Sequence, residues 1–515
     1  MRSILRTLTI FVALGAWSAH AQTTSITRFP ADRATGINPD THLVLTFASV
    51  PTIGKSGQIR IYDTSSHHLV DTLDLGVPAG PDPSRRFVSP PAQAIDPNPP
   101  TPTTTTPAVR TTPADLHNYQ LRTVGGLADF HFFPIIVRGY VATIYPHSDV
   151  LKFHHAYAVE IDRGVLTPAT GTFAGFGPEN SWNFTTKVAP PSATKTRLIV
   201  AADGTGDFST IQGAADFVPD NPTHRITIFI KNGNYEEIVF VRNKSNLTFR
   251  GEDRDKVQVG YGNNSAFNPP MPGPSRRCAF SVYDSTGIEL ENFSVSNYFF
   301  GQAEGLLIFG SKNIVSNMNI KGSGDALNLR GSVYLKDSTI IGDGDTILGV
   351  GPAFFDRCEI RSIGPFMWIR NTEANHGNVF VNSSFIAIER QVPWPVTSPQ
   401  SQSQTTPAAV TQPRAVSAVL ARLPNNHGLN YPYAEAVLID CHLRGVPKEG
   451  WGPIDGDTTH IHFWEFHSTD LEGNPVDTIK RHPASRQLIR PQDSLVIANY
   501  SNPTFVLGWK PAARQ

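Results

Sequence analysis

Residues 324–349 read GDALNLRGSVYLKDSTIIGDGDTILG, and this stretch repeats one short phrase. GDAL (324–327) returns twenty residues later as GDTI (344–347). Two carboxylates held close together divide acid–base work, because their repulsion makes one keep its proton to a higher pH than the other. The ionised member is then a nucleophile or base, and the protonated member an acid. Asp325 and Asp345 are therefore candidate catalytic residues.

A repeating fold is needed to bring these two aspartates together. An Asn or Asp followed by a short apolar run recurs along the chain, and counting from Asn292, Asn317, Asp337, Asp356 and Asn382 gives spacings of 25, 20, 19 and 26 residues. Such repeats, with one short strand each and no helical period, indicate a solenoid. We predict a right-handed parallel β-helix over residues 196–515, with successive rungs about 4.8 Å apart.

Gln302, in the phrase QAEGLLI, lies one further rung before Asp325. An uncharged amide donor in the same column is suited to stabilise a developing oxyanion. The same spacing also fits a different hypothesis, in which Asp, Asn and Gly form ladders of turn residues without any chemistry. Spacing alone leaves both hypotheses open.

The first part of the chain has a different sequence pattern. Residues 22–187 contain short alternating runs that predict a sandwich of antiparallel strands, with a Pro/Thr-rich insertion at about 89–113. The phrase FPADRATGINPDTHLVLTFA resembles bacterial Ig-like modules. Residues 188–195 are predicted to be a linker, and apolar residues at helical spacing over 211–218 predict a short helix at the entrance of the solenoid.

The N-terminus predicts export. Residues 1–21 combine a basic head, an apolar run and an A-x-A site, as in a secretory signal peptide cut after Ala21, so we expect an extracellular or periplasmic protein. No later segment is long and apolar enough to predict a membrane span. The net charge of −1 and the lack of basic runs argue against nucleic acid as a partner. The three cysteines, Cys278, Cys358 and Cys441, are too few for a disulfide scaffold.

Six phrases resemble, in this order, segments of the pectin methylesterases, a carbohydrate esterase family. They are VAADGTGDFSTIQGAADFVPDN, IKNGNYEEIVFV, GQAEGLLI, GDALN, GDTILG and EGW. The resemblance spans roughly residues 196–512. It implies a right-handed parallel β-helix, pectin (homogalacturonan) as the partner and the C6 methyl ester of polygalacturonate as the substrate.

The resemblance also implies roles for single residues. Asp345 matches the nucleophile of the family, Asp325 the acid/base and Gln302 an oxyanion donor. The family places an Arg and a Trp in LGRPW, which is absent here. Arg422, in LARLPNNHGLNYPY, is our candidate for that arginine, and a rival alignment puts Tyr431 at this position.

Two departures from the family pattern bear on activity. Gly324 stands where the family has a second oxyanion glutamine, and no Trp follows Arg422 at the expected place. Losing one oxyanion donor costs about 10²–10³ in turnover, so Asn328 or a backbone N–H would have to replace it. Besides an active esterase, the sequence thus leaves open a catalytically impaired polysaccharide-binding protein and, with less support, a pectate lyase.

Further residues are candidates for binding the sugar chain. Tyr433 and Trp451 are expected to line a groove, because aromatic faces stack on pyranose rings, and Arg330 to bind a galacturonate carboxylate. His460 and His462 alternate as a metal pair would, but no third ligand at a telling spacing follows. We expect a monomer that requires no metal or other cofactor.

Overall fold

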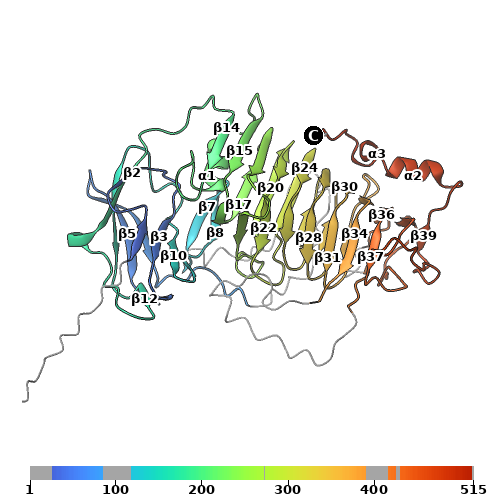
Figure 1. The fold of residues 1–515 in the computed structure, drawn as a ribbon, viewed down its shortest axis with the longest axis horizontal. Coiled ribbons are helices and arrows are strands. Elements are labelled where there is room, and N and C mark those ends of the chain that lie inside the picture. The colour runs from blue at the N-terminus through green and yellow to red at the C-terminus, as the bar shows by residue number, and fades with distance from the viewer. Residues whose placement is uncertain (1–25, 85–117, 272, 390–415, 425–429, 513–515) are drawn as a thin grey trace, which may run out of the picture.

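The computed structural model describes residues 26–84, 118–271, 273–389, 416–424 and 430–512. In this part of the chain two β-rich regions lie end to end along the long axis (Figure 1). The predicted signal peptide (1–21) and the predicted Pro/Thr-rich insertion (about 89–113) lie outside the described residues. No helix in the described ranges is long and apolar enough to cross a bilayer.

The N-terminal region contains two main sheets, and all their strand pairs except β13–β2 are antiparallel. Buried and partly exposed residues alternate along β5 and β11, which is why they form half-buried strands. The four-stranded sheet has the order β1 (Thr27–Phe29), β3 (Leu43–Thr46), β10 (Val141–Ile144), β9 (Ile135–Arg138). The five-stranded sheet has the order β2 (Ala34–Ile37), β13 (Trp182–Thr186), β11 (Ala156–Ile161), β5 (Gln58–Asp63), β6 (His68–Asp74).

Smaller elements complete this region. They are the pairs β4 (Pro51–Ile53) with β12 (Leu166–Pro168) and β7 (Leu121–Val124) with β8 (Leu127–His131), and the 3₁₀ turn η2 (Pro178–Asn180). The Ig-like assignment of the region stays a prediction, as do its proposed boundaries and the linker at 188–195.

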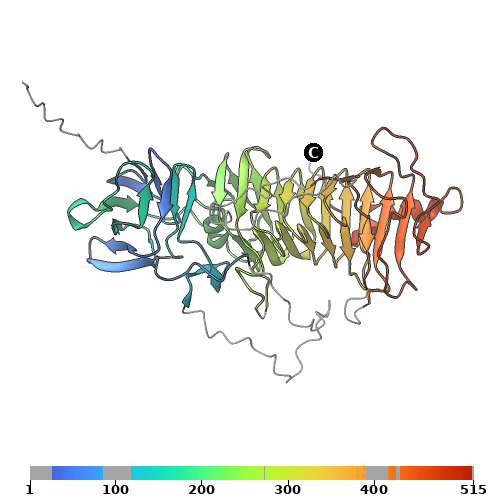
Figure 2. The same ribbon diagram turned by 90° about the horizontal axis from the view of Figure 1, so that it is seen from below.

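From β14 onward the chain forms three long parallel sheets, and Figure 2 shows the strands of successive rungs stacked along the axis. The predicted parallel β-helix is confirmed. The eleven-stranded sheet runs β14 (Arg197–Val200), β15 (Ile226–Ile230), β18 (Leu247–Gly251), β21 (Glu289–Glu291), β24 (Asn313–Ser316), β27 (Val333–Lys336), β30 (Ala353–Asp356), β33 (Asn378–Val381), β36 (Glu435–Ile439), β38 (His462–Phe466), β39 (Ser485–Gln487).

The other two sheets of the β-helix are shorter. The eight-stranded sheet runs β16 (Gly233–Glu236), β19 (Val257–Tyr261), β22 (Ser294–Asn297), β25 (Asn319–Lys321), β28 (Thr339–Gly342), β31 (Glu359–Ser362), β34 (Ser384–Ala387), β37 (His442–Arg444). The seven-stranded sheet runs β17 (Val239–Arg242), β20 (Phe280–Thr286), β23 (Leu306–Ser311), β26 (Leu327–Leu329), β29 (Ile347–Gly349), β32 (Met367–Ile369), β35 (Ala421–Arg422).

The repeated Asn or Asp has a conformational cause. Asn317, Asp337 and Asn382 all have positive φ, in the turn between the eleven-stranded and eight-stranded sheets, and Asn and Asp tolerate this left-handed conformation better than other non-glycine residues. In one rung the residue with positive φ is Arg357 (φ 52°), so counting from Asp356 was wrong by one position. Counted from Arg357, the spacings to Asp337 and Asn382 become 20 and 25 residues.

Three α-helices among the described residues pack against the β-helix. The predicted short helix is present as α1 (Ile211–Phe217), whose N-terminal Thr210 accepts a hydrogen bond from the Gly213 N–H and whose apolar side joins the core. At the other end α2 (Ser494–Tyr500) and α3 (Pro503–Leu507) pack on the outer face of the eleven-stranded sheet through a separate apolar cluster.

The two regions share a hydrophobic core. Phe240 of β17 points away from the β-helix interior and meets Phe130 of β8, with ring centroids 5.7 Å apart. Arg276 forms a two-point ion pair with Asp129 at 2.8 and 2.9 Å, and it is only 6% exposed. The N-terminal region therefore covers one end of the outer face of the seven-stranded sheet.

Replacing Phe240 tests this shared core. Phe240→Ala should destabilise the protein by about 3–5 kcal/mol, because it removes a fully buried ring from both regions at once. We expect hydrogen exchange measured by mass spectrometry to speed up in peptides of both regions. Phe249→Ala, which empties only the β-helix core, is the matched control and should leave the N-terminal peptides protected. Loss of protection confined to the β-helix in Phe240→Ala would contradict a shared core.

Candidate active site

The seven-stranded sheet positions the two candidate aspartates. Leu327 of β26 pairs with Ile347 of β29, so Asp325 and Asp345, each two residues earlier, lie on adjacent rungs. Both have positive φ, 65° and 45°, in the turn that leads into their strands. Their side chains are 13% and 18% exposed. Both carboxylates are thus held in tight turns, partly buried but open to a ligand.

Asp345 is paired with Arg422, the last residue of β35 in the same sheet. Nε of Arg422 donates to Oδ1 of Asp345 at 2.6 Å, and Nη2 donates to Oδ2, which is the two-point geometry of a strong charge-assisted pair. The guanidinium also lies over the ring of Trp368, 4.6 Å from its centroid. Tyr431, the rival in the sequence alignment, instead packs against the β-helix core.

Asp325 has a different environment. Nη2 of Arg277 lies 3.5 Å from its Oδ2, and Arg277 itself is held by Glu304, which has no exposed surface. The pKa of Asp325 is raised to about 7: burial raises it most and the charge of Glu304 raises it next, while Arg277 and Arg370 lower it. Asp345 has the smallest of these effects. The charge of Asp345 does raise the pKa of Asp325, as we expected, but burial and Glu304 are larger causes than repulsion between the two aspartates.

Gln302 presents one end of its amide to the site. Its Oε1 accepts hydrogen bonds from Ser265 Oγ and from Arg277 Nη1, both at 2.8 Å. The acceptor end is thus occupied, and the amide NH₂ is the end left for a ligand. The residue is exposed, which leaves this donor accessible.

The suggested replacement Asn328 and the backbone N–H of Gly324, which stands in place of the second glutamine, both already donate hydrogen bonds to carboxylates. Gly324 has φ +50° and its N–H donates to Asp343 Oδ1 at 2.7 Å. Asn328 is 1% exposed and donates to Glu304 Oε1 at 3.2 Å. The proposal that Asn328 stabilises an oxyanion was therefore wrong, because its amide is buried against another carboxylate.

The three predicted sugar-binding residues differ in position. Trp451 is 2% exposed, stacks on Phe463 with centroids 4.8 Å apart and donates to Glu465 at 3.0 Å, so its predicted place in a groove was wrong. Tyr433 is partly exposed and stacks on His460. Arg330 is partly exposed on the outer face of the seven-stranded sheet.

Sequence reasoning missed the pair that surrounds Asp325. Arg277 lies in the loop before β20, and Glu304 lies two residues after Gln302. Glu304 is the one charged residue in the otherwise apolar run AEGLLI. Because charged residues are almost never buried unless they are paired, this position was the available signal that Glu304 has a partner in the site. Arg277 had no such signal, because only the fold brings its loop against Gln302 and Asp325.

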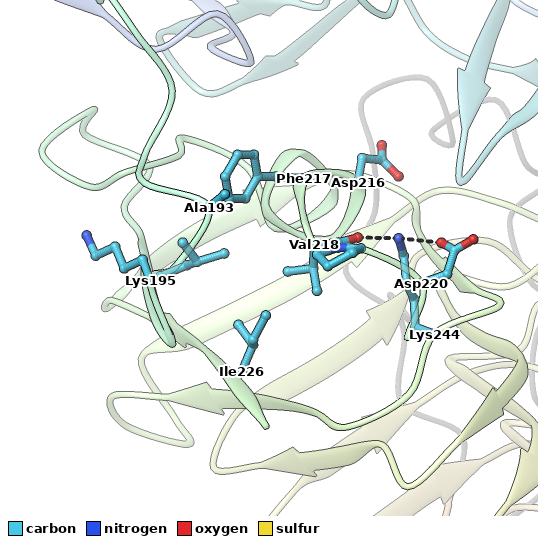
Figure 3. Close-up of a pocket in the computed structure, with 10 residues that line it drawn as sticks. Ala193, Lys195, Asp216, Phe217, Val218, Asp220, Ile226 and Lys244 are labelled. Atoms are coloured by element: carbon cyan, nitrogen blue, oxygen red, sulfur yellow. Dashed lines mark hydrogen bonds and ion pairs between the residues drawn. The ribbon is translucent and has the colours of Figure 1, made fainter. Parts of the chain in front are cut away.

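A cavity of about 540 Å³ lies elsewhere, beside α1 (Figure 3). Phe217 and Val218 at the end of α1 face it, and Lys244 bridges the Val218 carbonyl and Asp220 at its edge. The residues that line it include none of the candidate catalytic residues.

Residues 197–390, which contain Gln302, Asp325 and Asp345, match the family model "Pectinesterase". This match confirms the resemblance to the pectin methylesterases. "Probable pectinesterase 30" of Arabidopsis thaliana is 30% identical over 172 residues, which are 33% of this chain and 34% of that protein. "Pectinesterase QRT1" of Arabidopsis thaliana is 32% identical over 201 residues, which are 36% of this chain and 53% of that protein.

The chain thus spans about a third of the first relative and about half of the second. Among solved structures, the pectin methylesterase from carrot is similar, with a TM-score of 0.47 and 18% identity. The similarity covers 63% of this chain and 95% of that one.

The cause of the raised pKa of Asp325 is testable by carboxyl ¹³C NMR titration. We expect Asp325 to titrate near pH 7. Glu304→Gln should lower this pKa, because it removes the repelling charge and releases Arg277 to pair with Asp325. Asp345→Asn is the matched control and should lower the pKa of Asp325 by less than Glu304→Gln does. If Asp345→Asn lowered the pKa of Asp325 more than Glu304→Gln did, mutual repulsion of the two aspartates would be the main cause of the raised pKa.

Proposed function

We propose that this protein is an exported carboxylic ester hydrolase that removes methyl groups from pectin, releasing pectate and methanol. The observation that carries the proposal is the unequal pairing of two carboxylates on adjacent rungs. Asp345 is paired at two points with Arg422, whereas Asp325 lies beside the buried Glu304. The family match over 197–390 supports the reaction class. Export is supported by the signal-like sequence of residues 1–21.

The first step uses Asp345 as the nucleophile. Arg422 orients its carboxylate, and one oxygen attacks the ester carbonyl carbon of the galacturonate unit. The amide NH₂ of Gln302 donates a hydrogen bond to the developing oxyanion. Collapse of the tetrahedral intermediate breaks the bond to the methoxy oxygen and leaves a mixed anhydride between Asp345 and the sugar.

Asp325 donates a proton in the first step and accepts one in the second. Near neutral pH it retains a proton because it is buried and faces Glu304, and it donates this proton to the departing methoxy oxygen, forming methanol. In the second step Asp325 accepts a proton from the water that attacks the anhydride. Hydrolysis regenerates the Asp345 carboxylate and releases the sugar as a carboxylic acid, which ionises in solvent.

Arg277 and Glu304 act on this reaction by positioning other groups. Arg277 uses its N–H groups on Glu304, Gln302 and Ser265, so it fixes the amide of Gln302. Glu304 in turn keeps Arg277 from fully neutralising Asp325. Both are positioning residues, since neither reaches the reacting atoms in the proposed mechanism.

A catalytically impaired pectin-binding protein is the second candidate. It is favoured by Gly324, which leaves the site with one amide donor for the oxyanion where the family pattern has two. The two candidates differ in methanol release, whereas both bind pectin.

Asp345→Asn tests the nucleophile. We expect methanol release from highly methylated pectin to fall by at least about 10³, because the amide cannot attack the ester. Asp337→Asn changes a turn aspartate that pairs with Arg357 away from the site and should retain wild-type release. Release that survives Asp345→Asn would refute the proposed nucleophile, and a wild-type protein without release would favour the impaired binder.

The pH dependence tests the acid. Asp325 must be protonated for the first step and has a pKa of about 7, so kcat/KM for methanol release should fall as the pH rises through about 7. Glu304→Gln should move this fall to lower pH, because it lowers the pKa of Asp325. A profile that stays flat from pH 6 to pH 9 would contradict the assignment of Asp325 as the acid.

A further inference from the structure

One loop lies between the N-terminal region and Gln302, the proposed oxyanion donor. We call it the bridging loop; it joins β19 to β20, and its described residues are 262–271 and 273–279. Its residues contact the N-terminal region on one side and Gln302 on the other, at two places from neighbouring positions in the sequence. The loop thus gives the N-terminal region a physical connection to the site.

Two consecutive arginines of the bridging loop have partners on opposite sides. Arg276 forms the two-point ion pair with Asp129 of β8, at 2.8 and 2.9 Å, and it is 6% exposed. Nη1 of Arg277 donates to Oε1 of Gln302 at 2.8 Å. Because the two arginines share a planar peptide bond, fixing the Arg276 side chain limits the positions open to the backbone of Arg277.

The same division recurs near the start of the bridging loop. The side-chain amide of Asn264 donates to the Pro83 carbonyl of the N-terminal region at 2.9 Å and to the Phe300 carbonyl at 2.8 Å. Oγ of Ser265 donates to Oε1 of Gln302 at 2.8 Å, and the Ser265 N–H donates to the Gln302 carbonyl at 3.0 Å. Both the side chain and the backbone of Gln302 are therefore held by this loop.

The middle of the bridging loop is anchored in the N-terminal region. Nδ1 of His131 donates to the Phe267 carbonyl at 2.7 Å, and the His131 N–H donates to Oδ1 of Asn268 at 2.8 Å. The ring of Phe267 stacks on Phe133, with centroids 4.6 Å apart, inside the core that the two regions share. Asp129 and His131 lie two residues apart on β8, so one face of this strand holds the loop.

Gln302 needs this support because its side chain is exposed. The last torsion of a glutamine side chain has a roughly two-fold preference, so a half-turn exchanges the oxygen and the NH₂ group at little cost. Such a turn would put an acceptor where the oxyanion requires a donor. Gly324 leaves the site with one amide donor, so the orientation of Gln302 is decisive.

We propose that the N-terminal region is a positioning element of the active site, which keeps the NH₂ group of Gln302 turned toward the oxyanion through the bridging loop. Asp129 and His131 are the positioning residues, and neither reaches the reacting atoms. This inference rests on the proposed function, because it gives the N-terminal region a part in the same reaction. The region then contributes to turnover as well as covering one end of the seven-stranded sheet.

A double-mutant cycle with Gln302 tests this connection. Asp129→Ala releases Arg276 and should lower kcat for methanol release by at least about tenfold with KM within about twofold, because a misplaced oxyanion donor weakens stabilisation of the transition state alone. In the Gln302→Ala background the same change should lower kcat by less than about twofold, because the group that it positions is absent. An equal fall in both backgrounds would show a merely structural role and overturn the proposal.

Two further variants serve as controls. Asp40→Asn is the matched control, because Asp40 also joins the two regions but accepts from the Ser209 and Thr210 N–H groups before α1, and it should leave kcat unchanged. Asp129→Asn keeps the shape of the side chain, which guards against a folding defect in the alanine variant. It should lower kcat by a smaller factor, and only where Gln302 is present. A wild-type kcat in both Asp129 variants would overturn the proposal.

Hydrogen exchange measured by mass spectrometry distinguishes this proposal from the proposed function. Asp129→Ala should speed up exchange in peptides covering residues 262–271, which include the Ser265 N–H bound to Gln302, whereas Asp40→Asn should not. Unchanged exchange there in Asp129→Ala would overturn the proposal, because the N-terminal region would not be holding the loop. A wild type without methanol release would instead refute the proposed function, and the exchange result would still decide whether the N-terminal region holds Gln302.

Discussion

The parallel register of the seven-stranded sheet is the constraint on which the candidate site depends. It stacks β26, β29, β32 and β35, so residues that are far apart in the sequence meet on one face. Asp325 and Asp345 come from adjacent rungs, and Arg422 arrives from two rungs further on to pair with Asp345. A slip of one residue in any of these pairings would turn the side chains to the other face of the sheet.

The chemical difference between the two aspartates arises from their partners. Asp345 forms a two-point ion pair with an arginine, whereas the arginine beside Asp325 is already paired with Glu304. Burial and Glu304 together favour the protonated form of Asp325. The buried pair of Arg277 and Glu304 is thus tied both to the amide of Gln302 and to the protonation of the acid, and one local network controls two catalytic groups.

Much of the fold could be predicted from the sequence, because its signals are periodic. The recurring Asn and Asp predicted stacked rungs, and the repeated Gly-Asp phrase placed the two aspartates on neighbouring ones. Prediction failed where the environment is set by distant parts of the chain. Trp451 in EGWGP shows no sign of pointing inward, and Arg277 meets Asp325 only through the path of its loop. The repeat was counted from Asp356 and not from its neighbour Arg357, because composition alone cannot show which residue of a turn adopts positive φ.

The central claim is that Asp345 forms a covalent bond to the substrate while Asp325 moves the protons. Its most direct test is the Asp325→Asn variant with a 4-nitrophenyl ester of a galacturonate oligomer, whose leaving group needs no acid. We expect a burst of about one nitrophenol per protein, and intact and peptide mass spectrometry should find the sugar on Asp345, because hydrolysis lacks its base. Turnover without a burst or an adduct, or an adduct on another residue, would contradict the account.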